Sequence, residues 1–305
     1  MWWIIPIIVL AILIPYFITC HIAFNKIFKR GKEIPLISLD LSKTQYKDYE
    51  KELREYTSFF DDIKPEIVSI KSNDGLTLKG YYYKNKLDKL IICFHGYRAI
   101  PLNNFPVMGK KLYEKGYSLL MIVERSHSIS DGKYITFGDK EKYDCINWID
   151  YSNQYIKPKE IYLYGLSMGA ATILLASALG FSDNVKGLIA DSSFDESYHA
   201  VVSGLRRTVG FTPHITLLFI RLLMKIHKIN VKRNKVYEAV AKNKIKTLFI
   251  HGKNDKLVPI AEGRKNYDAA ICQKEWIETE AEHVLSIYTN MDLISNKIIN
   301  FIEEE

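Results

Sequence analysis

The stretch Ile161-Tyr-Leu-Tyr-Gly-Leu-Ser-Met-Gly169 determines how the rest of this chain is interpreted. Its first four residues predict a short buried strand, and the residues from 168 to 179, rich in alanine and leucine, predict a helix. The pattern G-x-S-x-G between them is typical of a tight strand-to-helix turn, where small residues two positions from the serine avoid clashes with both elements. In this context Ser167 is predicted to be a nucleophile.

Strand and helix patterns alternate on both sides of this turn. Strands are predicted at 66–70, 76–83, 89–94, 117–123, 161–165, 185–190, 247–251 and 273–279, and the run KLIICF at 89–94 is nearly unbroken in its apolar character. Helices are predicted near 104–115, 139–154, 168–179 and 284–302. The first two strands flank Asn73-Asp74-Gly75, a turn typical of hairpins. This order predicts an α/β protein with a mostly parallel, doubly wound sheet opened by an antiparallel hairpin.

A serine nucleophile needs a base and an acid, which follow it as acid and then histidine in this arrangement. Asp255 comes after the strand at 247–251, and His283 comes after the strand at 273–279. Open α/β sheets place their sites at this carboxyl edge. We therefore expect His283 to take the proton of Ser167 and Asp255 to hold the imidazole. Asp191, after the strand at 185–190, is the alternative acid.

Two backbone N–H groups are candidates for an oxyanion hole. Met168 follows the nucleophile at the start of its helix, and Tyr97 follows Gly96 in the loop after the strand at 89–94. We expect His95 in that loop to brace the backbone, and His251 to end its strand.

Residues 191–246 interrupt the alternation, because they contain no strand signal. Within them, ITLLFIRLLMKI (215–226) is almost wholly apolar and helical in character. Long insertions usually carry function, so we expect a helical lid at about 195–240, with Leu218 and Leu222 contacting the substrate. The alternative is a buried core helix. A second membrane span is not expected, since Arg221 interrupts a run that is already too short.

The N-terminal segment is uncharged over residues 2–18 and largely apolar as far as Phe24. A helix of about 20 apolar residues crosses a membrane. A cleaved secretory signal would need a basic start and a small-residue cleavage site, and neither is present. We expect a transmembrane anchor at 1–25, a basic and helical neck at 26–63, and a catalytic domain at 64–305. The lysines and arginine at 26–32 predict that the domain lies on the cytoplasmic side of the cell membrane.

Composition excludes several other classes of protein. The chain has 305 residues, 48% of them hydrophobic and 25% charged, which is typical of a globular protein and not of a disordered one. The net charge of +7 comes from scattered basic residues, so no nucleic-acid partner is predicted. The four cysteines form no CxxC pair, and neither a metal site nor a disulfide framework is predicted.

Over about residues 64–303 the chain resembles membrane-anchored bacterial α/β-hydrolases of the serine aminopeptidase-like (peptidase S9/S33-type) group. The resemblance rests on residues 74–80, 95–97, 125–138, 165–169, 190–192 and 251–259. It implies the α/β-hydrolase fold, a triad of Ser167, Asp255 and His283, no metal and no organic cofactor. The group usually has Asp where this chain has Glu124, and His-Gly where it has His127-Ser128.

These observations favour a serine hydrolase that cleaves a hydrophobic acyl ester through an acyl-enzyme. Its predicted partners are a small-molecule or lipid ester and the membrane. Two alternatives stay open. One is a serine peptidase or aminopeptidase, whose carboxylates for a free amine have no sequence signature. The other is a membrane-anchored binding protein on an inactive hydrolase scaffold.

Overall fold

The computed structural model describes residues 3–33, 46–210 and 214–304, and its centre is one eight-stranded sheet. The strand order is β1-β2-β4-β3-β5-β6-β7-β8. The strands are β1 (Glu66–Lys71), β2 (Thr77–Tyr83), β3 (Lys89–Phe94), β4 (Ser118–Val123), β5 (Glu160–Leu166), β6 (Val185–Asp191), β7 (Lys246–Gly252) and β8 (Lys274–Thr279). β2 pairs antiparallel with both β1 and β4, and all the other pairs are parallel. The predicted sheet is confirmed, and each strand lies within one residue of its predicted bounds.

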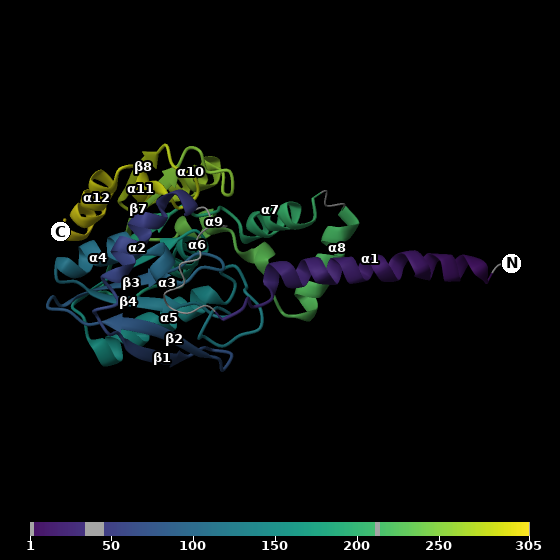
Figure 1. Cartoon of the computed structure of the whole chain (residues 1–305), viewed down its shortest axis with the longest axis horizontal. Coiled ribbons are helices and arrows are strands. Elements are labelled where there is room, and N and C mark those ends of the chain that lie inside the picture. The colour runs from purple at the N-terminus through teal and green to yellow at the C-terminus, as the bar shows by residue number, and fades with distance from the viewer. Residues whose placement is uncertain (1–2, 34–45, 211–213, 305) are drawn as a thin grey trace.

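Helices cover both faces of the sheet, which explains why its central strands are apolar throughout. One face is covered by α5 (Glu141–Tyr151), α6 (Met168–Ser177), α9 (Val236–Val240) and α10 (Ile260–Ala269). The other is covered by α2 (Glu50–Ser58), α3 (Pro101–Asn104), α4 (Pro106–Glu114), α11 (Ser286–Thr289) and α12 (Met291–Glu303). Short helical turns lie at η1 (Lys47–Tyr49), η2 (Ser152–Ile156) and η3 (Val231–Arg233). Figure 1 shows these layers and the carboxyl-terminal helix at the end of the molecule far from the N-terminus.

The N-terminal helix α1 (Ile4–Phe28) projects from these layers (Figure 1). It is long and apolar enough to cross a membrane, by length and composition. Most of its apolar side chains are exposed, but Phe24, Ile27 and Phe28 are buried in the core of the domain. The boundary predicted near residue 25 therefore passes through packed residues.

The predicted neck at 26–63 is also packed in part against the domain. Residues 34–45 lie outside the described part of the chain. Beyond them, helix α2 packs against α4, and its Leu53 is buried with Phe60 in the second core. The helix was predicted, but its docking against the domain was not, because the sequence pattern gave only its amphipathic character.

The insertion between β6 and β7 is helical, as predicted. It contains α7 (Ser197–Val209) and α8 (His214–Ile226), and residues 211–213 between them are not described. α8 packs against α1 through aromatic side chains, with the rings of Phe17 and Phe219 4.0 Å apart. α7 lies between α8 and the sheet (Figure 1).

Candidate active site

Ser167 lies on the predicted turn between β5 and α6. Its backbone has a φ of 54°, in the left-handed region that side chains rarely adopt. A Cβ atom at Gly169 would lie 2.0 Å from the carbonyl oxygen of Phe94, and one at Gly165 would lie 2.5 Å from the backbone of Gly169. Glycine at these two positions is therefore required for the turn to pack against β3 and α6.

Asp255 and His283 lie in the loops after β7 and β8; His283 contacts Ser167, and Asp255 contacts His283. His283 Nε2 lies 2.8 Å from Ser167 Oγ, and His283 Nδ1 lies 2.6 Å from Asp255 Oδ2. The other oxygen of Asp255 accepts hydrogen bonds from the backbone N–H groups of Leu257 and Val258. The structure thus brings together the three residues that the sequence singled out.

The environment of Asp255 keeps it ionised. Its side chain is fully buried, which by itself raises the pKa, but hydrogen bonds from His251 and His283 outweigh burial and hold the pKa well below its ordinary value. His283 Nδ1 therefore donates to a carboxylate, and Nε2 is left as the acceptor that faces the serine hydroxyl.

His251 supports the same loop. It ends β7, as predicted, and its Nε2 donates to the carbonyl oxygen of Val258 at 2.9 Å while lying 3.5 Å from Asp255 Oδ2. Burial lowers its pKa, but the neighbouring Asp255 outweighs this and raises it overall. The sequence gave no sign of this second role, because the contact joins the end of a strand to a loop whose path is set by tertiary packing.

Asp191, the alternative acid, hydrogen-bonds to Ser192, whereas His283 hydrogen-bonds to Asp255. Its Oδ1 accepts a hydrogen bond from Ser192 Oγ at 2.8 Å, and its backbone oxygen accepts one from the N–H of Ser167. Burial raises the pKa of Asp191 to about 6, although Ser192 opposes the shift. The geometry favours Asp255 as the partner of His283.

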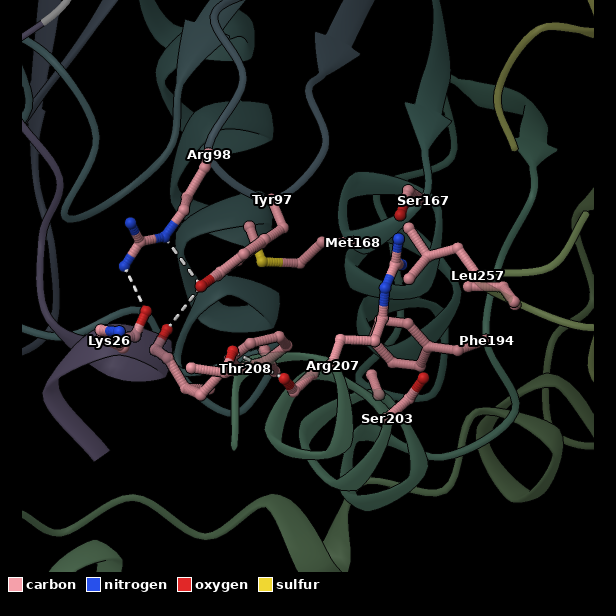
Figure 2. Close-up of a pocket in the computed structure, with 15 residues that line it drawn as sticks. Lys26, Tyr97, Arg98, Ser167, Met168, Phe194, Ser203, Arg207, Thr208 and Leu257 are labelled. Carbon is pink, nitrogen blue, oxygen red and sulfur yellow. Dashed lines mark hydrogen bonds between the residues drawn. The ribbon is translucent and has the colours of Figure 1, made fainter. Parts of the chain in front are cut away.

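Met168 and Tyr97 carry the two predicted oxyanion donors. Both residues line a cavity together with Ser167 (Figure 2). Within the described residues, neither backbone N–H donates a hydrogen bond to a protein acceptor. Both N–H groups are therefore available to a further hydrogen-bond acceptor.

Two buried histidines brace the loop that carries Tyr97. His95 Nε2 accepts the N–H of Glu124 at 3.1 Å, and His127 Nε2 accepts the N–H of Arg98 at 3.0 Å. Because a backbone N–H only donates, each ring nitrogen must be unprotonated. Burial agrees, since it lowers the pKa of His95 to about 3 and that of His127 to about 4. His95 was predicted to brace the loop, and His127 was not.

Ser167 opens onto two cavities. The first, of about 320 Å³, is lined mainly by apolar side chains from α1, α7 and the sheet edge, among them Ile27, Phe137, Phe194, Ala200 and Val258. The second, of about 340 Å³, is more polar and is lined by Asn103, Asn104, Tyr46 and His283 among others. Both volumes fall within the range of roughly 300 to 1,000 Å³ that is usual for small-molecule sites.

Leu218 and Leu222 line neither cavity, so their predicted place in the substrate pocket needs correction. They are on α8, which packs against α1, and Leu218 is 62% exposed. Helix α7 lines the first cavity instead, through Ala200 and Gly204 and through Ser203, Arg207 and Thr208, which Figure 2 labels. The sequence predicted that the insertion lies near the site, but it did not show which of the two helices faces Ser167.

One group in the described residues has the composition of a metal site: Asp195, Glu196 and His199 at the start of α7. Asp195 already binds the ammonium of Lys265 at 2.8 Å and His199 Nδ1 at 2.8 Å. None of the three lines a cavity at Ser167. The ion pair with Lys265 and the hydrogen bond with His199 account for the position of Asp195.

The chain is similar in sequence or in structure to several known proteins. No family model matches the chain. The uncharacterized protein YqkD of Bacillus subtilis (strain 168) is 26% identical over 250 residues, covering 80% of this chain and 81% of YqkD. The esterase Pf2001 of Pyrococcus furiosus has a TM-score of 0.68 and 20% identity, covering 91% of this chain and 97% of its own. Est1E of Butyrivibrio proteoclasticus, with ferulic acid bound, has a TM-score of 0.59 and 22% identity, and the match covers 78% of this chain and 98% of the Est1E chain. The chain has the α/β-hydrolase fold, and its structural neighbours include esterases.

Proposed function

We propose that the chain is a serine hydrolase that cleaves acyl esters through an acyl-enzyme. The observation that carries the proposal is the chain of short contacts from Ser167 Oγ through His283 to Asp255, at 2.8 and 2.6 Å. Ser167 Oγ attacks the ester carbonyl carbon while His283 Nε2 takes the hydroxyl proton. The oxyanion faces the N–H groups of Met168 and Tyr97, and His283 then gives its proton to the leaving alcohol. A water molecule, activated in the same way by His283, releases the acid and restores Ser167.

The two cavities suggest how the ester is oriented. His283 protonates the leaving group, so the alcohol has to lie on the side of His283, in the more polar second cavity. The acyl group then occupies the first cavity, whose walls include Phe137, Phe194 and Val258. This orientation supports a hydrophobic acyl group, with α7 as the covering element of the predicted lid.

Charge supports an ester substrate over the aminopeptidase alternative. An aminopeptidase needs carboxylates that bind the free amine of its substrate. The described residues that line the two cavities include Lys26, Arg98 and Arg207, but no aspartate or glutamate. Figure 2 shows Arg207 extending from α7 toward Ser167, where it would repel an ammonium group. The esterases among the structural neighbours agree with this choice.

We also propose that α1 anchors the chain in the cell membrane, with residues 64–305 as the catalytic domain on the cytoplasmic side. The support is the apolar length of Ile4–Phe28 and the basic residues Lys26, Lys29 and Arg30 at its end.

Labelling with a fluorophosphonate tests the hydrolase proposal directly, because the reagent forms a covalent bond only with an activated serine. Wild-type chain should be labelled, and Ser167→Ala and His283→Ala should not. A series of p-nitrophenyl esters of increasing acyl length then tests the substrate class. Labelling of Ser167→Ala as strong as that of wild type would place the nucleophile elsewhere, and absence of labelling in the wild-type chain would favour an inactive scaffold.

A further inference from the structure

Helix α8 presents an apolar face that no described part of the chain covers. Ile215, Leu218, Leu222 and Ile226 recur at intervals of three or four residues, so they share one face of the helix. These side chains are 50%, 62%, 48% and 60% exposed, respectively. Thr216, Ile220 and Met224 on the other side are buried. A contiguous exposed stripe of this kind marks an interaction surface.

The apolar face of α8 continues the exposed surface of α1. Tyr16 hydroxyl lies 2.6 Å from Thr216 Oγ1, and the ring of Phe24 stacks on that of His227 at 5.3 Å, so α8 follows α1 from about residue 16 to residue 24. Between the two helices lies an apolar groove of about 350 Å³, lined by side chains such as Ile18, Ile22, Leu222 and Ile226. Figure 1 shows α8 crossing α1, outside the layers of the domain.

The charges around α8 identify what covers it. The segment 214–233 contains no acidic residue, and its basic residues are Arg221, Lys225, Lys228, Lys232 and Arg233. They gather toward the end of α8 that is nearest to the domain, where Arg221, Lys225, Lys228 and Lys232 line one surface hollow. An apolar face on one side and lysines and arginines at its edge are typical of a helix that lies in the interface of a bilayer with anionic lipids.

We propose that α8 is an interfacial membrane helix, inserted beside α1 with its apolar face against lipid chains and its basic end among lipid headgroups. The inference rests on the proposed membrane anchor, since α1 and α8 share one apolar surface. It differs from a second span, because α8 has 13 residues and does not cross the bilayer. It also gives Leu218 and Leu222 a role that the cavity at Ser167 does not.

The arrangement has a consequence for the proposed substrate. Helix α7 precedes α8 in the chain and lines the apolar cavity at Ser167 together with Ile27 of α1. The end of α1 and helix α7, which both line this cavity, would therefore lie at the membrane surface. An acyl chain in the outermost part of the bilayer has a short apolar path to the nucleophile.

Fluorescence quenching in vesicles tests the proposal. The full chain, with the half-buried Cys272 changed to Ser, is reconstituted in vesicles of phosphatidylcholine and phosphatidylglycerol. An environment-sensitive dye is attached at Leu218→Cys or Leu222→Cys. Val9→Cys in α1 is the positive control, and Leu293→Cys, an exposed leucine on α12, is the matched negative control. We expect lipids with a nitroxide on the acyl chain to quench the dye at 218, 222 and 9, and aqueous iodide to quench it at 293.

Each other outcome overturns the inference. Lipid quenching at Val9 without quenching at Leu218 and Leu222 would keep the anchor and reject the interfacial helix. Protection of Leu218 from both quenchers would show that protein, such as a second copy of this chain, covers α8. Absence of lipid quenching at all three positions would reject the anchor as well. Fluorophosphonate labelling of each variant reports separately on Ser167, so failure of the hydrolase proposal is distinguishable.

Discussion

The turn at Ser167 and the pair of helices α1 and α8 are held together by different kinds of contact. Around Ser167 the polar atoms are buried and directed at one another, from Asp255 through His283 to the serine hydroxyl. Between α1 and α8 most contacts join aromatic and aliphatic side chains, such as Phe17 on Phe219. In the first region Asp255 and His283 are buried, while the second leaves one face of α8 exposed.

The two kinds of contact predict different effects of amino-acid substitutions in the two regions. Hydrogen bonds weaken steeply with distance and angle, so the loss of one atom at the site removes a step of the chemistry. Apolar contacts scale with the area buried and have no preferred direction. Substitutions at the turn should therefore act mainly on kcat, and substitutions in the part of α7 that lines the apolar cavity should act mainly on substrate preference.

The largest effect is expected for Ser167→Ala. Without the hydroxyl no acyl-enzyme forms, and kcat on p-nitrophenyl butyrate should fall by a factor on the order of 10⁶. The melting temperature should stay close to that of wild type, because Ala keeps the Cβ atom that the turn already accommodates. Turnover similar to wild type would place the nucleophile elsewhere.

Asp255→Asn should be the next most severe change. Asn cannot hold the Nδ1–H tautomer of His283, so kcat should fall by about 10⁴ with the fold retained. Asp191→Asn is the matched comparison, since Asp191 is equally buried but bonds to Ser192. Steady-state kinetics of the two variants decide between them, and the reverse ranking would give the acid role to Asp191.

His127→Phe tests the bracing of the oxyanion loop. The ring is kept but its acceptor is removed, which leaves the Arg98 N–H without its partner at a cost of about 1–3 kcal/mol. The loop carrying Tyr97 should shift, lowering kcat by about tenfold with little change in KM. His127→Gln offers an acceptor and should recover part of the loss. A fall in melting temperature with kcat unchanged would limit His127 to a structural role.

Glu124→Gln should change stability in a pH-dependent way. Neither carboxyl oxygen of Glu124 has a hydrogen-bond partner among the described residues. Burial, reinforced by the charges of Glu141 and Asp144, raises its pKa well above the usual value. The folded chain therefore holds a proton that the unfolded chain releases above a pKa of about 4.3. Stability from this group is complete at low pH and is lost as the pH rises through the folded pKa.

The glutamine side chain in the variant does not titrate. The unfolding free energy of Glu124→Gln, relative to that of wild type, should therefore increase as the pH rises from about 4. Urea denaturation at a series of pH values measures this difference. A difference that stays constant with pH would show that Glu124 is already ionised in the folded chain.

Ala200→Leu should have the smallest effect, a change in acyl preference. Ala200 lines the apolar cavity, and a larger side chain there should displace the end of a long acyl chain. Each CH₂ group forced out costs about 0.8 kcal/mol, so the octanoate-to-acetate ratio of kcat/KM should fall several-fold. Leu218→Ser, assayed in detergent, should leave the ratio unchanged. An equal shift in that variant would return α8 to the acyl pocket.

The sequence predicted what depends on local pattern and chain order. The central strands are short apolar runs, and Asp255 and His283 come in the loops directly after two neighbouring strands. Because parallel strands end at one edge, this order was sufficient to bring the two residues toward Ser167. The role of the glycines at 165 and 169 was predictable for a similar reason, since it depends only on the local geometry of the turn.

Features that depend on the angle between elements were not predictable. An amphipathic pattern shows that α8 has an apolar face, but not whether that face meets Ser167, α1 or solvent. Leu218 and Leu222 were misplaced for this reason. The acceptor role of His127 toward Arg98 has the same origin, because it joins two loops that the sequence separates by 29 residues.

The end of α1 is hydrogen-bonded to the loop that carries Tyr97, the proposed oxyanion donor. The hydroxyl of Tyr97 donates to the carbonyl oxygen of Ile27 at 2.8 Å, and the guanidinium of Arg98 binds the carbonyl oxygens of Lys26 and Lys29. Proteolysis that trims the chain after residue 30 would take these acceptors away along with the buried Phe28. If the chain is the proposed hydrolase, we expect a fragment trimmed in that way to turn over substrate more slowly than the full-length chain.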